Sequence, residues 1–236
     1  SMAYFLAQKG HSITVFEAED KPGGMMRYGI PRYRLPRDII DQEIEIIQAL
    51  GVKIEYGKRL GTDFTLDDLR QQGFNAIFVG IGAWRGMGLR CEGEEHPDVW
   101  KGIDFLYNVE VGKIDKLNGK VLIVGGGNTA IDAARTSLRL GADPVHILYR
   151  RTRKEMPAHE IEIEEAIYEG VNIEFLVSPS KVVVDDNGKI KGLECVRMKL
   201  GEPDKSGRRR PIPIEGSEHL IEGDYIIGAI GQRPDK

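Results

Sequence analysis

A glycine-rich turn in the middle of the chain could hold the diphosphate of a dinucleotide. The turn follows the apolar run Lys120–Val124 directly and precedes a helical pattern over Ile131–Leu140. In such a strand–turn–helix the first glycine permits the tight turn, the second lets the backbone approach the diphosphate, and a small third residue allows close packing. The N–H groups of the first helical turn then face the ligand. The predicted contacts are Gly125, Gly127, Asn128, Thr129 and Ala130.

Two arginines follow the next predicted strand, Val145–Tyr149. An NAD-binding unit carries an acidic residue at this point for the ribose 2′-hydroxyl, whereas this chain carries Arg150 and Arg151. A guanidinium pairs with a phosphate through two parallel hydrogen bonds, so the arginines favour the 2′-phosphate of NADP(H). The weaker alternative is that they are solvated or paired with Glu155 and Glu160.

A carboxylate ends an earlier predicted strand. Glu17 follows the strand Ser12–Phe16, which a helical pattern over Ser1–Gln8 precedes. These elements correspond to the second half of another dinucleotide-binding unit, in which a carboxylate suits the unphosphorylated ribose of FAD or NAD. A surface glutamate at a strand end is the alternative. Because the first half of that unit is missing, we expect the chain to be an internal fragment.

The elements that must position these residues alternate between helix and strand, which predicts an α/β fold. An antiparallel extension is expected over residues 181–213, where the sequence alternates and turns at Asp186-Asn187-Gly188. The other predicted helices are Arg37–Leu50, Leu66–Gln72 after a Thr65 cap, Ile103–Val109 and Ile161–Tyr168; the other predicted strands are Val52–Tyr56, Ala76–Ile81, Val171–Val177 and Tyr225–Ile230.

The composition argues against several functions. A net charge of −4 argues against nucleic-acid binding, and the basic cluster Arg208–Arg210 is interpreted as a solvated hairpin tip. Cys91 and Cys195 are too far apart for a C-x-x-C pair, a metal site or an iron–sulfur site, and are expected to be small buried side chains. With no membrane-spanning run and no signal peptide, a cytoplasmic protein without a membrane partner is expected.

Several stretches resemble the glutamate synthase small (β) subunit family of NADPH-dependent FAD oxidoreductases, which is related to the N-terminal half of dihydropyrimidine dehydrogenase. The resemblance covers essentially the whole chain, and its longer stretches are specific. It is carried by Glu17 with Pro22-Gly23-Gly24-Met25-Met26-Arg27-Tyr28-Gly29-Ile30-Pro31, by Val124–Arg135, by Tyr149–Ala158 and by Ala229–Pro234.

The resemblance implies a glutathione-reductase-like fold with two dinucleotide-binding domains, in which an NADP domain is inserted into a truncated FAD domain. The implied division is 1–101 for the partial FAD domain, 102–224 for the NADP domain and 225–236 for the strand that returns to the FAD domain. The implied flavin-side contacts are Glu17, Gly23, Gly24 and Arg27, with Gly82 and Gly231 where the chain crosses between the domains.

The implied reaction passes hydride from NADPH to FAD and electrons onward to an iron–sulfur partner or a large synthase subunit. The family's first glycine-rich turn, its C-terminal Gly-Asp motif and its cysteine-rich segment are missing. The resemblance implies two cofactors, NADP and FAD. Because the turn that would hold the FAD diphosphate is missing, the sequence supports the binding of NADP more strongly than that of FAD. Hydride transfer depends on positioning more than on an acid or base, so no catalytic side chain is predicted. The alternative is a non-catalytic NADP-binding or assembly module.

Overall fold

The computed structural model describes residues 1–204 and 207–234. The chain divides into two compact units, Ser1–Gly82 (unit 1) and Ala83–Lys236 (unit 2), and each is described by itself. Within the described residues, no helix combines the length and the apolar character that crossing a membrane would require.

Unit 1 contains a short parallel sheet and four helices. Strands β1 (Thr14–Phe16) and β2 (Lys53–Glu55) pair in parallel. Helix α4 (Leu66–Gln71) begins at the predicted cap, where the Asp68 N–H donates to the Thr65 hydroxyl at 3.2 Å and the Thr65 N–H donates to the Asp68 carboxylate at 2.8 Å. The remaining helices are α1 (Met2–Gln8), α2 (Gly24–Tyr28) and α3 (Arg37–Ala49).

One predicted strand of unit 1 is wrong. Residues 76–81 form no strand, and the side chains of Phe78 and Val79 are exposed. A buried parallel strand needs hydrogen-bonded neighbours and cover on both faces. The sheet of β1 and β2 has no further strand among residues 1–82, so these apolar side chains stay in contact with solvent.

A five-stranded parallel sheet forms the centre of unit 2. Its order is β4-β12-β5-β6-β7, and every neighbouring pair is parallel. The carboxyl ends of all these strands therefore meet at one edge of the sheet. The strands are β4 (Val99–Lys101), β5 (Val121–Val124), β6 (Val145–Tyr149), β7 (Asn172–Phe175) and β12 (Tyr225–Gly228).

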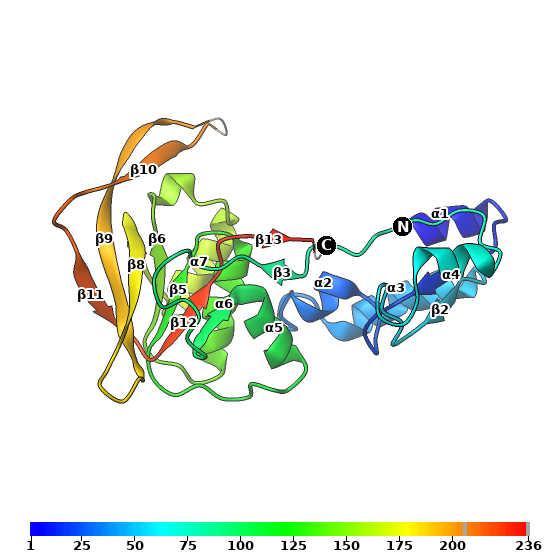
Figure 1. Ribbon diagram of the computed structural model, residues 1–236, viewed down its shortest axis with the longest axis horizontal. Coiled ribbons are helices and arrows are strands. Elements are labelled where there is room, and N and C mark those ends of the chain that lie inside the picture. The colour runs from blue at the N-terminus through cyan, green and yellow to red at the C-terminus, as the bar shows by residue number, and fades with distance from the viewer. Residues whose placement is uncertain (205–206, 235–236) are drawn as a thin grey trace. The chain divides into compact units, whose positions relative to one another are not determined.

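Both faces of this sheet are covered, as the continuous apolar sequence of β5 predicts. Val121 and Ile123 belong to the core on the helical side, whereas Leu122 and Val124 belong to the core on the side of the antiparallel strands. Figure 1 shows the helices and the antiparallel strands on opposite sides of the parallel sheet. The helices are α5 (Gly102–Glu110), α6 (Asn128–Arg139) and α7 (Glu160–Tyr168).

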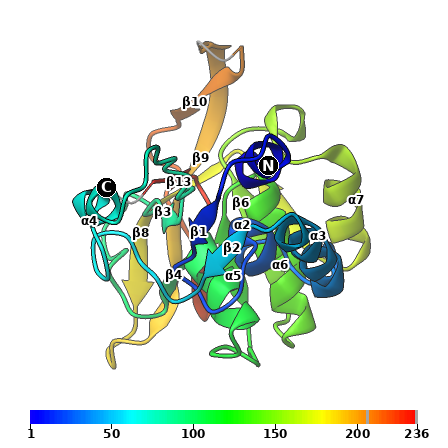
Figure 2. The same ribbon diagram turned by 90° about the vertical axis from the view of Figure 1, so that its right-hand side faces the viewer.

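The antiparallel sheet is built on the long strand β9 (Ile190–Pro203). The first half of β9 pairs with β8 and β11, and its second half pairs with β10. The hairpin of β9 and β10 projects beyond the rest of unit 2 (Figure 1 and Figure 2). The predicted antiparallel arrangement of residues 181–213 is confirmed. The partners of β9 are β8 (Val177–Val184), β10 (Arg209–Pro213) and β11 (His219–Glu222).

The predicted domain division is wrong at both ends of the inserted domain. Residues 225–236 were expected in the FAD domain, but β12 lies inside the sheet of unit 2, with Ile226 opposite Leu122. Residues 1–101 were expected to stay together, but the boundary between the units follows Gly82. The physical reason is burial: the side chain of Ile226 is 0% exposed, because a strand this apolar is stable where both faces are covered.

Arg135 is a buried charge that holds α6 to α7. Its side chain is 7% exposed, and its guanidinium donates to the carboxylates of Glu162, Glu165 and Glu169 over 2.7 to 3.1 Å. The guanidinium of Arg139 also reaches Glu169. The hydrogen bonds from Arg139, and then those from Arg135, lower the pKa of Glu169 from its ordinary value to about 2.

Replacing Arg135 with methionine should lower the free energy of unfolding by about 2 kcal/mol at neutral pH, because three carboxylates lose their buried partner. The lowered pKa of Glu169 stabilises the fold above its ordinary pKa of 4.5, and this stabilisation is lost as the pH falls toward 2. The difference between wild type and variant should therefore shrink in acid. Urea unfolding at neutral pH and at about pH 3 measures it.

Arg139→Met is the matched control, because Arg139 binds the same carboxylate with a side chain that is 40% exposed. Its cost should be clearly smaller than that of Arg135→Met. Equal stability of wild type and Arg135→Met at neutral pH would contradict a stabilising role for the buried guanidinium.

Candidate functional site

The direction of the parallel sheet's connections reverses at β5. The chain leaves β5 through α6 to β6 and then through α7 to β7, whereas β12 lies on the other side of β5. In an open parallel sheet, the carboxyl ends of the strands at such a reversal flank a crevice in which ligands bind. The turn that begins at Gly125 follows β5 directly, so the predicted diphosphate contacts lie at this switch point.

The backbone conformation and the close packing of the chain require glycine at position 125. Its φ is +151°, and a Cβ at this position would lie 2.3 Å from the carbonyl oxygen of Ala229. The Ala229 N–H donates to the Val124 carbonyl at 2.8 Å, so the end of β12 packs directly against the turn. Ala130, the third small residue of the motif, is fully buried between helix and sheet, as predicted.

Gly127, by contrast, has room for a side chain. Its backbone is extended, with φ −94° and ψ 177°, a conformation that any residue adopts. The nearest atom to a Cβ built there is Pro157 Cγ, at 3.8 Å. Packing and backbone conformation therefore leave room for a side chain, yet the position holds glycine. This space precedes the first turn of α6, whose N–H groups favour an anion.

A segment that follows β6 borders the turn. The Ala158 N–H donates to the Gly126 carbonyl at 3.1 Å, and the His159 N–H donates to Asn128 Oδ1, also at 3.1 Å. The Asn128 side chain therefore fixes this border, and its main chain begins α6. Periodicity gave no sign of these contacts; the only signal was the family-like stretch Tyr149–Ala158.

The structure separates the two predicted arginines. Arg150, directly after β6, is exposed and has no hydrogen-bonded or ion-paired partner in the described part of the chain. Arg151 is 5% exposed. Its Nε donates to the Arg209 carbonyl at 2.7 Å, and its Nη2 donates to the Asp204 carboxylate at 2.9 Å. Arg150 is therefore available to a ligand, whereas the guanidinium of Arg151 is already engaged.

Pairing with glutamate side chains, the alternative to phosphate binding, is found at the nearby Arg153. Its guanidinium binds the carboxylates of Glu160 and Glu164, beyond the short turn η1 (Arg153–Glu155). Glu155 does not bind an arginine side chain there: its carboxylate accepts the Thr152 N–H at 3.2 Å. These contacts leave Arg150 as the available guanidinium next to β6.

On the β12 side of the turn, the backbone of Gly231 comes near Thr129. Gln232 Nε2 donates to Thr129 Oγ1 at 3.4 Å, and the Met87 N–H donates to the Gly231 carbonyl at 3.0 Å. The predicted contacts Thr129 and Gly231 are thus brought to the same side of the switch point. Gly102, which begins α5, also lies here, because a Cβ on it would be 3.0 Å from Thr129 Cγ2.

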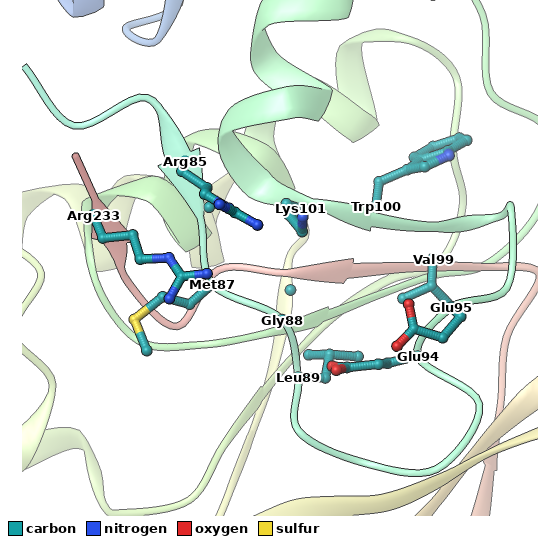
Figure 3. Close-up of a pocket in the computed structure, with 12 residues that line it drawn as sticks. Arg85, Met87, Gly88, Leu89, Glu94, Glu95, Val99, Trp100, Lys101 and Arg233 are labelled. Carbon is teal, nitrogen blue, oxygen red and sulfur yellow. The ribbon is translucent and has the colours of Figure 1, made fainter. Parts of the chain in front are cut away.

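A cavity of about 160 Å³ lies at the ends of β4 and β12. Figure 3 shows three cationic side chains, Arg85, Lys101 and Arg233, at this cavity. Arg85 and Arg233 are directly opposite each other in the antiparallel ribbon of β3 (Arg85–Gly86) and β13 (Gln232–Arg233). None of these three cationic residues is among the contacts predicted from the sequence, because segments far apart in the chain supply them.

The predicted flavin-side residues of unit 1 are mostly engaged in local structure. Glu17 directly follows β1, as predicted, and its Oε1 accepts the Glu19 N–H at 3.0 Å. The Arg27 side chain is 4% exposed, donates from Nε to the Pro22 carbonyl at 2.6 Å and pairs with Asp41. Arg27 therefore joins α2 to α3 and offers little to a ligand.

The three predicted glycines of this part have left-handed backbones. Gly23 has φ +124°, and a Cβ there would lie 2.9 Å from Ile40 Cγ2, so the loop packs closely on α3. Gly24 (φ +52°) and Gly82 (φ +72°) also lie in the left-handed region. Gly82 is the last residue of unit 1.

Neither cysteine is a reactive thiol. Burial raises the pKa of Cys91 to about 11 and that of Cys195 to about 12, whereas thiol chemistry needs the thiolate. Cys195 is fully buried, as predicted, and Cys91 is half-buried.

Comparison with known proteins gives concordant results. Residues 1–236 match the pyridine nucleotide-disulphide oxidoreductase family. The chain is 49% identical over 238 residues to the NADP(+)-dependent formate dehydrogenase subunit beta of Moorella thermoacetica, covering 100% of this chain and 33% of that protein. It is 34% identical over 244 residues to the glutamate synthase [NADPH] small chain of Escherichia coli (strain K12), covering 97% and 51%.

Among solved structures, Mycobacterium tuberculosis FprA in complex with NADPH resembles the chain with a TM-score of 0.83. The match covers 100% of this chain and 68% of FprA at 17% identity, so it concerns the fold. The chain spans about a third of the length of its formate dehydrogenase relative and about half of its glutamate synthase relative.

Proposed function

Because the chain belongs to the pyridine nucleotide-disulphide oxidoreductase family, we propose that it is part of an NADPH-dependent flavoprotein oxidoreductase subunit. In this proposal NADPH binds to unit 2 and passes hydride to FAD, and electrons leave toward an iron–sulfur partner or a large synthase subunit. Two relatives are named as a subunit beta and a small chain, which supports a role as one subunit of a larger enzyme.

The observation that carries the NADPH assignment is the room for a side chain at Gly127, on the same sheet edge as the unpaired guanidinium of Arg150. Gly127 lies before α6 at the end of β5, and Arg150 follows β6, the neighbouring strand. A diphosphate over the helix N-terminus places the adenosine ribose toward the end of β6. The 2′-phosphate of that ribose then meets Arg150.

In this proposal the residues of unit 2 bind and orient NADPH. The first turn of α6 holds the diphosphate, and Arg150 fixes the adenosine end. The nicotinamide end is directed to the other side of β5, where Thr129 and Gly231 lie. The coenzyme would then lie across the carboxyl end of β5, with one end toward β6 and the other toward β12.

The fit of FAD is less complete. Glu17 stands where a carboxylate meets the ribose hydroxyls of a dinucleotide. Residues 1–82 contain no strand that runs directly into a glycine-rich turn and a long helix, which is the element that holds a diphosphate. FAD, when bound, would accept hydride and release single electrons; no residue of unit 1 is assigned a step in that chemistry.

The test is anaerobic addition of NADPH to the intact protein purified with its flavin. The flavin absorbance near about 450 nm should bleach, and NADH should bleach it more slowly. A flavin-loaded protein that NADPH leaves unbleached would contradict the proposed reaction.

A non-catalytic NADP-binding module is the second candidate, and the internal engagement of the predicted flavin-side residue Arg27, which pairs with Asp41 and donates to the Pro22 carbonyl, favours it. The two functions differ in flavin content. An intact protein that is colourless and still binds NADPH supports the module, whereas a yellow protein that NADPH bleaches supports the oxidoreductase.

A further inference from the structure

The hairpin of β9 and β10 is hydrogen-bonded to Arg151, the residue that follows the proposed phosphate ligand Arg150. Arg151 donates to the Arg209 carbonyl at 2.7 Å and to the Asp204 carboxylate at 2.9 Å. The Leu176 N–H donates to the Arg151 carbonyl at 3.1 Å. The bonds to Arg209 and Asp204 hold the distal part of the hairpin beside the end of β6, although 58 residues separate Arg151 from Arg209.

The two strands of the hairpin are also joined to each other by hydrogen bonds. The Asp204 N–H donates to the Arg208 carbonyl at 2.7 Å. The guanidinium of Arg209 is used inside the hairpin, where it donates to the carbonyls of Gly201 and Leu200 at 3.0 and 2.8 Å. Of the three clustered arginines, Arg209 is therefore structural, and Arg208 directly precedes it with its carbonyl bound by Asp204.

The region around Arg150 is positively charged. Partial desolvation, and after it the positive charge of Arg151, lowers the pKa of Arg150; Arg208 and Arg90 act on it in the same direction. Arg151 is neutralised by Asp204. The positive charges on this side of Arg150 favour the binding of a dianion there.

We propose that the β9–β10 hairpin forms a second wall of the 2′-phosphate site, with Arg208 contributing a guanidinium beside Arg150. Arg151 is a positioning residue that fixes the hairpin and does not touch the phosphate. This inference rests on the proposed binding of NADPH to unit 2, and it names a coenzyme-specificity element distant in sequence from the dinucleotide-binding turn.

The first test compares Arg208→Gln with the matched control Arg210→Gln in the intact protein. Arg210 is exposed in the same hairpin and is not among the charges that act on Arg150. The probes are 2′,5′-ADP, which carries the 2′-phosphate, and 5′-AMP, which lacks it, titrated by calorimetry. Arg208→Gln should weaken 2′,5′-ADP binding about tenfold and leave 5′-AMP unchanged, whereas Arg210→Gln should stay within about twofold of wild type.

The second test uses Asp204→Asn to separate anchoring from simple electrostatics. Removing a negative charge near a phosphate site should strengthen phosphate binding if charge alone matters. Loss of the anchor for Arg151 should instead weaken 2′,5′-ADP binding, because the hairpin no longer holds Arg208 in place. Weaker binding supports the positioning role, and tighter binding overturns it.

The outcomes also distinguish this inference from the assignment beneath it. Wild-type protein that binds 2′,5′-ADP no more tightly than 5′-AMP would refute the NADPH site itself. Wild type that prefers 2′,5′-ADP, with an equal preference in Arg208→Gln, would overturn the role of the hairpin alone. Thermal unfolding of each variant verifies that the fold is intact, and Arg208→Lys should restore part of the preference because it restores the charge.

Discussion

Replacing Gly127 with valine should abolish NADPH binding and leave unit 2 folded. The extended backbone at Gly127 accepts a β-branched residue, and the nearest atom to a Cβ there is 3.8 Å away. The cost to the fold is therefore about 1 kcal/mol, that of a poorer N-cap. The valine methyl groups would occupy the space of the diphosphate, so affinity should fall by more than about 100-fold.

Gly125→Val is the matched control, since it adds the same side chain two residues earlier. A Cβ at Gly125 would meet the Ala229 carbonyl oxygen at 2.3 Å, and its φ of +151° is unfavourable for valine. This variant should lose its cooperative thermal transition. NADPH titration and thermal unfolding of both variants measure the contrast. If Gly127→Val binds NADPH like wild type, the nucleotide lies elsewhere.

Replacing Arg150 with alanine should remove most of the preference for NADPH over NADH. A charge-assisted contact to the 2′-phosphate in a partly desolvated site is worth about 1.5–3 kcal/mol, or roughly 10- to 100-fold in affinity. NADH has no 2′-phosphate, so its affinity should not change. Titration of both coenzymes against wild type and variant measures the preference.

Arg153→Ala is the control for a general loss of positive charge near β6. Arg153 is bound by the carboxylates of Glu160 and Glu164, so its removal should leave the coenzyme preference as it was. If Arg150→Ala weakens NADPH and NADH equally, Arg150 shapes the site without reading the phosphate, and the NADP assignment falls.

The family resemblance and the fold class predicted from the sequence are confirmed. The elements around the switch point were predictable because each is a local signal. The apolar run of β5 ends at a glycine-rich turn, and β6 has the predicted bounds Val145–Tyr149. Such signals depend on neighbours in sequence, which a single chain displays directly.

Pairing between distant segments could not be predicted in the same way. An apolar strand such as Tyr225–Gly228 fits the centre of either sheet, and nothing within it specifies its neighbours. The segment Ala76–Ile81 has an equally apolar sequence, yet it forms no strand in unit 1. Hydrophobicity predicts that a segment favours burial, but the partner strands decide whether it is buried.

The assignment of polar side chains had the same limit. Arg150 and Arg151 are adjacent and chemically identical, so the sequence does not tell which of the two meets the 2′-phosphate. The structure distinguishes them because Asp204, 53 residues further on, lies beside one of them. Arg27 is a similar case, since Asp41 engages its guanidinium.

The position of β12 determines the order in which the parallel sheet can be completed. It is the last strand of that sheet to be synthesised, yet it lies between β4 and β5, and Tyr225 pairs with Val121 across 104 residues of chain. Until it arrives, β4 has no partner in the sheet and β5 presents an open edge, the kind of surface on which chains aggregate. Closure of a loop this long is slow compared with the local β5–α6–β6 pairing. The proposed coenzyme crevice beside β5 is thus completed on its β12 side only in the final stage of folding, after the glycine-rich turn and the end of β6 are already in place.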